Sequence, residues 1–423
     1  MKFFQKNLDK LNSEKCIPLL FFVMTFAAIL PLYFENIRQI SGFIFLLILL
    51  FLSVINFKMS LFKINHEEKI WLYIAVSYAL VLILNYVFRV PHTEDGEWRN
   101  ATPLFILLVS AWYFLSIRFN QQKQLIKYVA VSSVVCGVLL FLTEVSLLES
   151  LAGYRFGAVS DGARGLAATG FILPLTTGLL VVIWLKERSY FYLVLLVIAF
   201  LLSGLNGSKT AFSIVLAMIM FGGLYVLFWG KMLSKKVKWF LVAILIGLVF
   251  SSTWLAKSKI LAVGTDISGI KSGDYSTSTG LRYAMFNIGL EAIKGQWLFG
   301  VGPSQYKEYV ASVAQKSDYS MKVKSFTSNA MQIHNQYLMA LLLAGLAGAI
   351  TLLLFLMYPI KVFLSYFRVN NDPAALISIG LLFGVMFIML FGAVFTYTYT
   401  TIFYMLSVSA LISWFLNKKG AKG

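Results

Sequence analysis

The residue with the clearest capacity for chemistry is His334, which precedes a long apolar stretch in the run 334–337, His-Asn-Gln-Tyr. An ionisable group beside such a span is a functional candidate, because its desolvation is costly unless the group is used or well hydrogen-bonded. The two other histidines, His66 and His92, fall in polar stretches. His334 is therefore the histidine that the sequence offers for proton transfer at the edge of an apolar span.

Gly345 and Gly348 follow His334 at a spacing that predicts a shared helix face. At about 100° per residue, they lie about 20° and 40° from the direction of His334 on an α-helix. Glycines in a membrane helix allow another backbone to approach closely. We therefore expect His334 on a tightly packed face, as a functional group or as a histidine that hydrogen-bonds a carbonyl while the glycines serve packing alone.

Four cationic residues accompany this histidine. Arg282 falls in the first turn of a helix predicted over 280–294, where free backbone N–H groups, the helix dipole and a guanidinium together suit a phosphate. Lys209, Arg155 and Arg164 lie near the ends of apolar spans. Each alone also fits a lipid-headgroup anchor. Together they favour an anionic substrate that carries phosphate.

The acidic residues between the spans form no close pair with metal-ligand spacing, and Cys16 and Cys136 form neither a disulfide framework nor a metal motif. A site that held a diphosphate through a divalent cation would need carboxylate ligands. We therefore predict no metal and no cofactor, with cations that neutralise a diphosphate directly. The acids concerned are Glu94, Asp95, Glu97, Asp161, Asp266, Asp274, Glu291 and Asp318.

The composition predicts an all-α polytopic membrane protein. Hydrophobic residues make up 59% of the chain and charged residues 13%, against about a quarter charged in soluble domains. Apolar runs of about 20 residues, the length that spans a bilayer as a helix, recur throughout. We predict about twelve spans, at 16–34, 39–57, 70–88, 103–117, 128–147, 166–185, 190–204, 210–229, 239–256, 337–360, 374–395 and 399–416.

The basic residues predict the orientation of these spans. With the N-terminus in the cytoplasm, 21 of the 36 Lys and Arg residues fall in cytoplasmic segments and six in short outer loops. Both termini would then be cytoplasmic. Residues 1–423 would form one integral membrane domain with a large outer loop that contains short helices, 257–336, between spans 9 and 10. The net charge of +18 reflects this asymmetry, so we expect membrane lipids and no nucleic acid as partners.

The large loop contains its own structural signals. Leu281, Ala284, Met285, Ile288 and Ala292 recur at helical spacing, and a threonine or serine at 277–279 can cap the helix that they predict. Residues 299–303, Phe-Gly-Val-Gly-Pro, predict a turn. The segment 315–330 is polar and leads to His334.

These motifs resemble the O-antigen ligases, within the ligase and polymerase superfamily of bacterial envelopes. The resemblance rests on His334-Asn335 followed after nine residues by Gly345-x-x-Gly348, on 279–285 as the arginine segment of the loop, and on 299–302 as its Gly-x-Gly turn. The segment 206–211 lies where the family has a Ser/Thr-Arg segment. Here Lys209 replaces the arginine, and a lysine cannot make the planar bidentate contact.

The resemblance implies transfer of a glycan from undecaprenyl diphosphate to a sugar hydroxyl of lipid A–core, on the periplasmic face of the bacterial inner membrane. The fold would be of the membrane glycosyltransferase (GT-C-like) kind. His334 would take the proton of the acceptor hydroxyl and Arg282 would stabilise the leaving diphosphate. Lys209, Arg155, Arg164 and Asn335 would bind substrate.

Three alternatives remain open at this stage. An O-antigen polymerase would use the same lipid-linked donor, and the tight His-Asn-x9-Gly-x-x-Gly spacing favours the ligase over it. A protein O-oligosaccharyltransferase typically has an extended C-terminal region. A transporter of lipid-linked glycans predicts charges at mid-membrane, whereas 210–229 and 374–395 carry none.

Overall fold

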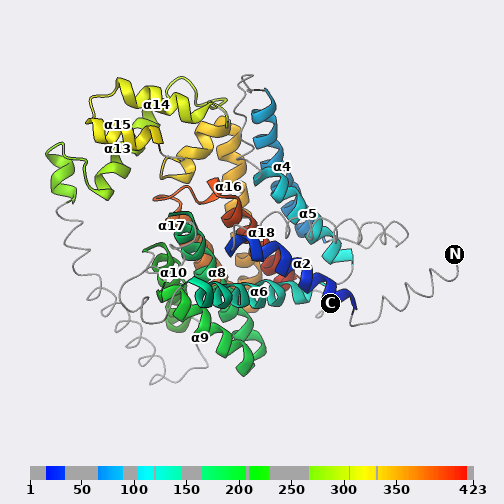
Figure 1. The fold of residues 1–423 in the computed structure, drawn as a ribbon. Coiled ribbons are helices and arrows are strands. Elements are labelled where there is room, and N and C mark those ends of the chain that lie inside the picture. Colours follow the sequence, from blue (N-terminus) through cyan, green and yellow to red (C-terminus); the bar gives the residue numbers. More distant parts are fainter. Residues whose placement is uncertain are drawn as a thin grey trace.

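The structure, a computed structural model, describes residues 16–33, 65–88, 102–118, 121–144, 163–205, 209–228, 266–303, 305–329 and 332–416. Within these ranges all regular secondary structure is helical (Figure 1). The named elements are α2 (Cys16–Tyr33), α4 (His66–Phe88), α5 (Thr102–Arg118), α6 (Gln122–Glu144), α8 (Ala163–Glu187), α9 (Tyr190–Leu205), α10 (Lys209–Phe228), α13 (Ser278–Ile293), α14 (Tyr306–Lys316), α15 (Met321–Asn329), α16 (Gln336–Asn370), α17 (Pro373–Ile388), the 3-10 helix η2 (Val394–Thr396) and α18 (Thr398–Leu416).

By length and composition, four stretches of the described chain can cross a membrane: Lys123–Thr143, Gly170–Glu187, Gln336–Asn370 and Tyr399–Leu416. Shorter apolar helices accompany them at Ile17–Leu30, Pro103–Ile117, Tyr190–Ser203, Ile214–Tyr225 and Pro373–Ile388. An all-helical membrane protein is thus supported. The count of twelve spans and the GT-C-like architecture stay predictions, since the spans predicted at 39–57 and 239–256 lie outside the described residues.

The helix at the centre of the bundle is α18. Every side chain from residue 400 to residue 416 is buried, and α18 packs against α2, α5, α6, α8 and α16 (Figure 1). A helix that is apolar all round must lie inside a protein or a membrane. Two of its serines form hydrogen bonds with α4: Ser409 accepts a bond from the Trp71 indole at 2.9 Å, and Ser413 donates to Glu68 at 3.3 Å.

The longest helix, α16, is interrupted. Its 35 residues would extend about 52 Å as one straight helix, well beyond a hydrocarbon core of about 30 Å. Ala344 and Gly345 leave the helical conformation, and Gly345 has a φ of 60°. The helix therefore consists of a short first part, 336–343, and a long second part, 346–370. The predicted span 337–360 falls across this break and ends ten residues before the helix does.

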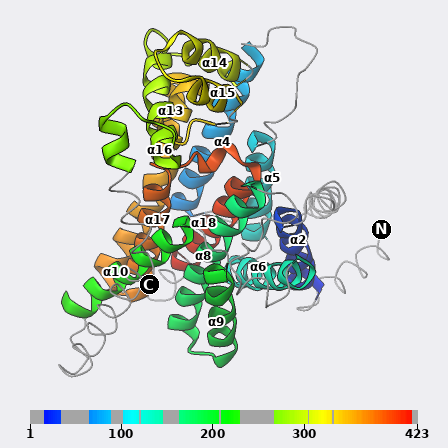
Figure 2. The same ribbon diagram turned by 60° about the vertical axis from the view of Figure 1, so that its left-hand side comes forward.

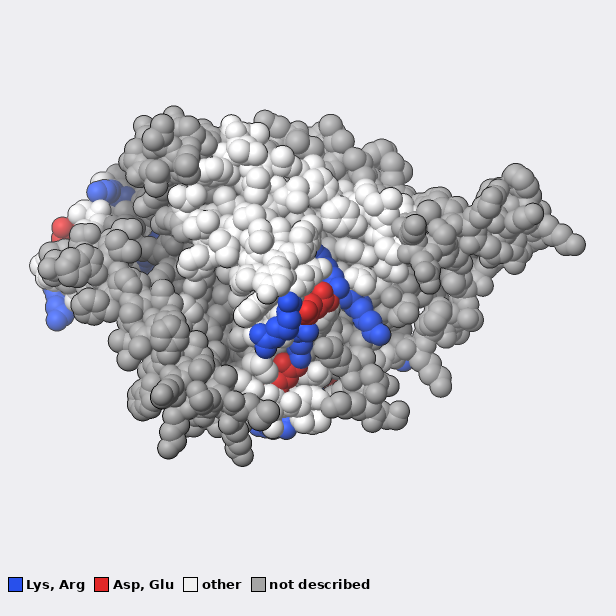
Figure 3. All heavy atoms as spheres, turned by 90° about the horizontal axis from the view of Figure 1, so that it is seen from below, with Lys and Arg blue, Asp and Glu red and all other residues white. Residues whose placement is uncertain are grey.

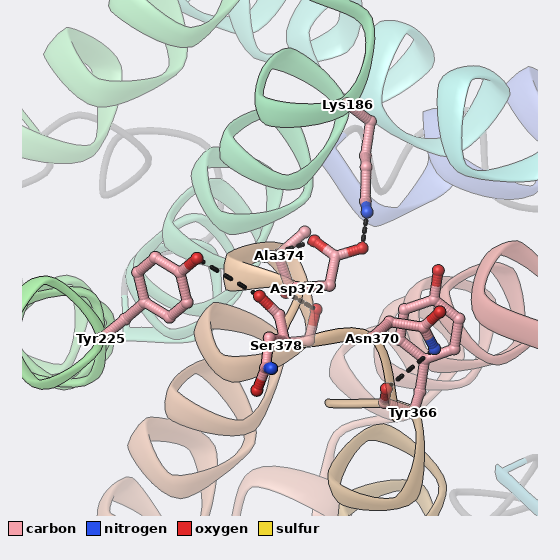
Figure 4. A network of polar contacts seen from close by, with 8 residues as sticks. Lys186, Tyr225, Tyr366, Asn370, Asp372, Ala374 and Ser378 are labelled. Carbon is pink, nitrogen blue, oxygen red and sulfur yellow. Dashed lines mark hydrogen bonds and ion pairs between the residues drawn. The ribbon is translucent and has the colours of Figure 1, made fainter. Parts of the chain in front are cut away.

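The end of α16 at Asn370 is fastened by a network of polar contacts (Figure 4). Asn371 adopts a left-handed conformation that ends the helix, and its carbonyl accepts a bond from the Tyr225 hydroxyl at 3.2 Å. Asp372 caps α17 by accepting from the Ala374 N–H at 3.1 Å, and its carboxylate also pairs with Lys186 at the end of α8. This network joins α8, α10, α16 and α17 at one level of the bundle.

Charged side chains gather on the face seen from below in Figure 3. There, Lys, Arg, Asp and Glu form a central group beside uncharged residues, and further charged residues lie at the left edge of the view. Among the described ion pairs, Lys127 with Glu187 and Lys186 with Asp372 both involve the C-terminal end of α8. The predicted orientation places this end of α8 in the cytoplasm, and that orientation remains a prediction.

Helices α13, α14 and α15 form a separate module above the first turns of α16 (Figures 1 and 2). The module has its own apolar core, to which all three helices and the start of α16 contribute. The predicted loop helix is confirmed as α13, with Thr277 as its cap, accepting from the Gly280 N–H at 3.1 Å. The five residues with helical spacing are buried as expected. Helix α14 and the helical character of 321–329 were not predicted, because these segments are polar on most of their surface.

Candidate functional site

His334 lies in a non-helical segment, 332–335, between α15 and α16. The predicted helix face shared by His334, Gly345 and Gly348 is therefore wrong. One reason is that α16 starts only at Gln336, because Asn335 caps it with a side-chain oxygen that accepts from the Leu338 N–H at 2.9 Å. The other is that the break at Gly345 interrupts the helical register on which the spacing argument depended.

The oxygen and the nitrogen of the Asn335 side-chain amide both form hydrogen bonds. Besides capping α16, its Nδ2 donates to the carbonyl of Leu390 at 3.2 Å, and the residue is buried. The structure thus places Asn335 where it fixes the backbone on which His334 lies. Its predicted contact with substrate stays a prediction.

Two glutamines that sequence reasoning missed attach the His334 segment to residues 389–397, the connection between α17 and α18. The Gln336 N–H donates to the Met389 carbonyl at 2.8 Å, and the Gln336 Oε1 accepts from the Phe395 N–H at 2.6 Å. The Gln332 Nε2 donates to the Tyr397 hydroxyl at 2.9 Å. The signal available in the sequence was the spacing of these glutamines, each two residues from His334.

The same contacts correct the predicted span 374–395. Helix α17 ends at Ile388, and residues 389–397 form turns and the short helix η2. The stretch is apolar enough to continue a helix. Its backbone groups instead form hydrogen bonds with Asn335 and Gln336. Leaving these backbone groups buried and unpaired would cost more free energy.

The loop module is locked onto α16 by two glycines with positive φ, Gly300 and Gly345. At the break in α16 the Leu342 carbonyl accepts from the Val301 N–H at 2.7 Å, and the Leu346 N–H donates to the Leu298 carbonyl at 3.1 Å. A Cβ on Gly345 would overlap that Leu298 carbonyl, and one on Gly300 would lie 2.6 Å from the Gly345 nitrogen. The backbones meet so closely that neither position has room for a side chain.

Arg282 lies on α13, which packs against the His334 segment. At Gly289 the helix backbone lies against the side chains of Leu338 and Ile333, since a Cβ there would lie 2.6 Å from a Leu338 methyl group and 2.8 Å from an Ile333 methyl group. The Arg282 side chain is exposed by surface area, although the protein around it lowers its pKa through desolvation. An arginine remains charged under these conditions, so α13 presents a positive charge beside the segment that carries His334.

Burial is the main cause that lowers the pKa of His334, to about 4, and the positive charge of Arg282 lowers it further. The imidazole is therefore neutral at neutral pH. A neutral imidazole has one nitrogen that can accept a proton. The structure thus brings together the two residues predicted to be catalytic and keeps the histidine in the form that a general base requires.

The other three predicted cations are not tested. Lys209 begins α10, and Arg164 is the second residue of α8, but their side chains lie outside the described part of the structure. Arg155 lies outside the described residues altogether. Their substrate contacts stay predictions.

Buried polar atoms without a hydrogen-bond partner occur on the segments that flank His334. Such atoms each cost about 1–3 kcal/mol, so folded proteins retain few of them. These four side chains are well enclosed, and only Gln332 makes a bond, through the other end of its amide. The atoms are Thr327 Oγ1, Ser328 Oγ, Gln332 Oε1 and Thr396 Oγ1. Within the described residues, no group of three or more His, Cys, Asp or Glu has the geometry to hold a metal ion.

Fold and site together define a class: a helical membrane protein whose loop module places an arginine beside a neutral histidine. The family model described as O-antigen ligase matches residues 191–353, which include Arg282, His334 and the two glycines of the lock. This match confirms the predicted resemblance to the O-antigen ligase superfamily. A protein of Haemophilus influenzae described as uncharacterized is 24% identical over 315 residues, which cover 73% of this chain and 75% of that protein.

Proposed function

We propose that this protein transfers a glycan from undecaprenyl diphosphate to a sugar hydroxyl of lipid A–core, as an O-antigen ligase of the bacterial inner membrane. The observation that carries the proposal is the pairing of a neutral, partly buried His334 with the positive charge of Arg282. The family match over 191–353 supports a glycan transferase of this superfamily.

In the proposed reaction, one nitrogen of the His334 imidazole takes the proton of the acceptor hydroxyl. The hydroxyl oxygen attacks the anomeric carbon of the donor glycan, and the bond from that carbon to the diphosphate oxygen breaks. The diphosphate leaves with the bonding electrons, and Arg282 stabilises the charge that develops on it. Lys209, Arg155 and Arg164 would hold the remaining phosphate charge.

Donor binding would also prepare the base. An anionic diphosphate beside Arg282 offsets the positive charge that now lowers the pKa of His334. Opposite charge near a group favours its protonated, cationic form. The donor would therefore raise the basicity of the imidazole when the substrate is in place. Desolvation keeps the imidazole neutral until then.

The proposal includes an orientation. Both termini would be cytoplasmic, and the module of α13, α14 and α15 would be periplasmic, where the lipid-linked donor and lipid A–core meet. This assignment is supported by the excess of basic residues in the segments predicted to be cytoplasmic. Accessibility of a cysteine introduced at the exposed Lys307 to a membrane-impermeant reagent in whole cells tests it.

The decisive experiment distinguishes a ligase from a polymerase. In a strain that lacks the gene, a ligase predicts long polymer retained on undecaprenyl diphosphate together with bare lipid A–core. A polymerase predicts core that bears a single repeat unit. Complementation with the wild-type chain should restore laddered lipopolysaccharide, and complementation with His334→Ala should not.

A further inference from the structure

We propose that Tyr275, Tyr283 and Tyr319 form a carbohydrate-binding surface on the loop module, which holds the glycan next to Arg282. The inference deepens the proposed function and rests on it, because it assigns a subsite to the same substrate. The three tyrosines come from three segments: the loop before α13, the second turn of α13, and the turn between α14 and α15. Only the tertiary structure brings these residues together.

The rings have the arrangement of a binding platform. Tyr275 and Tyr283 lie nearly parallel, with centroids 6.2 Å apart and an interplanar angle of 6°, and Tyr319 meets Tyr275 edge-on at 5.0 Å. Tyr275 and Tyr319 pack partly against the module core, whereas Tyr283 is 45% exposed. Tyr319 thus supports Tyr275, and Tyr275 supports Tyr283, which is the most exposed ring of the three. Aromatic faces of this kind accept the C–H groups of a sugar ring, since the face of a ring carries negative charge.

Polar groups surround this platform. Asp274 is exposed, and its carboxylate accepts from the Ser276 N–H at 2.8 Å. Lys322 donates to the Ser276 carbonyl at 3.1 Å, and Asn287 donates to the Tyr319 hydroxyl at 3.2 Å. Carboxylate, ammonium and amide groups at the rim of aromatic rings supply both donors and acceptors for sugar hydroxyls. The class of ligand is therefore an oligosaccharide.

The position of the platform fits the donor glycan. Tyr283 follows Arg282 directly on α13, so a glycan whose diphosphate lies at Arg282 begins beside the open ring. The exposed face of α13 continues from Arg282 through Phe286 to Leu290. A chain of several sugars can therefore extend along the module.

A membrane surface is the competing ligand for exposed aromatic residues, and another part of the module suits it better. Trp297, Leu298 and Phe299 are exposed at the turn that docks on the break in α16, next to the exposed Leu346 and Ile350 of that helix. This stretch is apolar and continuous with a membrane-spanning segment. The tyrosine platform has charged neighbours instead.

The test compares Tyr283→Ala with Tyr283→Phe in the full-length protein in lipid nanodiscs. The probe is the oligosaccharide of several repeat units released by mild acid from the lipid-linked glycan of the producing strain. We expect Tyr283→Ala to weaken binding of this probe about tenfold, and Tyr283→Phe to retain it. With a lipid-linked donor of several repeats, Tyr283→Ala should raise KM about tenfold and leave kcat nearly unchanged.

Tyr190→Ala, at an 84% exposed tyrosine of α9, is the matched control and should leave both probe binding and KM unchanged. Unchanged probe binding in Tyr283→Ala would overturn the inference. So would equal losses in the alanine and phenylalanine variants, or an alanine variant that loses only affinity for vesicles of phosphatidylethanolamine and phosphatidylglycerol. If the strain that lacks the gene still attaches long polymer to lipid A–core while Tyr283→Ala loses probe binding, the proposed function fails and the glycan surface stands.

Discussion

The two ends of α16 differ in whether the polar groups around them have hydrogen-bond or ion-pair partners. At the Asn370 end, the left-handed Asn371, the capping Asp372, Lys186 and Tyr225 are joined in a network of ion pairs and hydrogen bonds (Figure 4). At the opposite end, the helix is broken, an arginine is exposed, and buried atoms on the flanking segments have no partner.

We therefore expect the Asn370 end of α16 to contribute to stability and the opposite end to contribute to function. Satisfied polar groups hold helices together at the first end. Unpaired buried polar atoms are costly and persist only where the surrounding structure compensates for them. Four lie on the segments that flank His334, and others within the described residues lie on α5, α6 and α18. The comparison therefore predicts that substitutions at the His334 end affect activity and that those at the Asp372 end affect stability.

The largest effect on activity is expected from His334→Ala. Loss of a general base typically costs a factor of about 10²–10⁴, so transfer from a lipid-linked donor to lipid A–core should fall by that range. Thermal unfolding in nanodiscs should change little. The matched control is His66→Ala, at an exposed histidine that begins α4. An active His334→Ala protein would remove this residue from the chemistry.

The largest effect on stability is expected from Asp372→Ala. The substitution removes the carboxylate that pairs with the partly buried Lys186 and that caps α17, at a cost of about 3–5 kcal/mol. Activity per folded molecule should be retained. Lys361→Ala is the control, because Lys361 is 62% exposed and 4.0 Å from Glu67; it should cost about 1 kcal/mol or less. Equal costs in the two variants would contradict the contrast.

Gly345→Ala should lower both the stability and the transfer activity. The new methyl group meets the Leu298 carbonyl and forces a strained φ, at a cost of about 1–3 kcal/mol. Because the loop module would no longer dock closely on α16, transfer activity should fall by more than the loss of folded protein explains. Gly222→Ala, with no neighbour nearer than 4.0 Å, should stay fully active. Normal activity in Gly345→Ala would show that the close contact between the Gly300 turn and the break in α16 is not needed for transfer.

Arg282→Gln should shift the pH dependence of kcat/KM. Desolvation and the charge of Arg282 hold the pKa of His334 at about 4, so activity of the wild type should persist as pH falls and be lost only near pH 4. Removing the charge should move this acid limb to higher pH, toward the ordinary histidine pKa of 6.5. The maximum of kcat/KM should be lower than in the wild type. A wild-type limb already near pH 6.5 would argue against the described environment of His334.

The smallest change is expected from Thr396→Val. Because the Thr396 hydroxyl is buried without a partner, its removal should leave stability unchanged or raise it by up to about 1 kcal/mol. The control Thr400→Val removes a hydroxyl that donates to the Tyr397 carbonyl at 2.9 Å and should destabilise by about 1 kcal/mol. Equal destabilisation in both variants would show that Thr396 has a partner after all.

Parts of this structure followed directly from local patterns. The apolar face of α13 was predicted from five residues at helical spacing, and its cap from the threonines and serine before it. The turn at 299–303 was predicted from its glycines and proline, and the structure confirms it. These features depend on residues within a few positions of one another, which is why the sequence was sufficient.

Other parts depended on contacts between segments far apart in the chain. The spacing of His334, Gly345 and Gly348 predicted one helix face, but Asn335 starts the helix later and the turn at Gly300 fits into a break within it. The apolar stretch 389–395 was predicted to continue a span and instead bonds Asn335 and Gln336. Neither outcome is visible in local periodicity.

The sequence by itself determined that the chain is helical, apolar and basic, and it predicted that His334 and Arg282 act in one site. The tertiary structure decided why His334 is neutral and how it is held. Its pKa depends on burial and on a charge from another helix, and its position depends on backbone contacts between α16, the Gly300 turn and residues 389–397. Desolvation and close packing are properties of the assembled fold, so residue types and spacing alone cannot specify them.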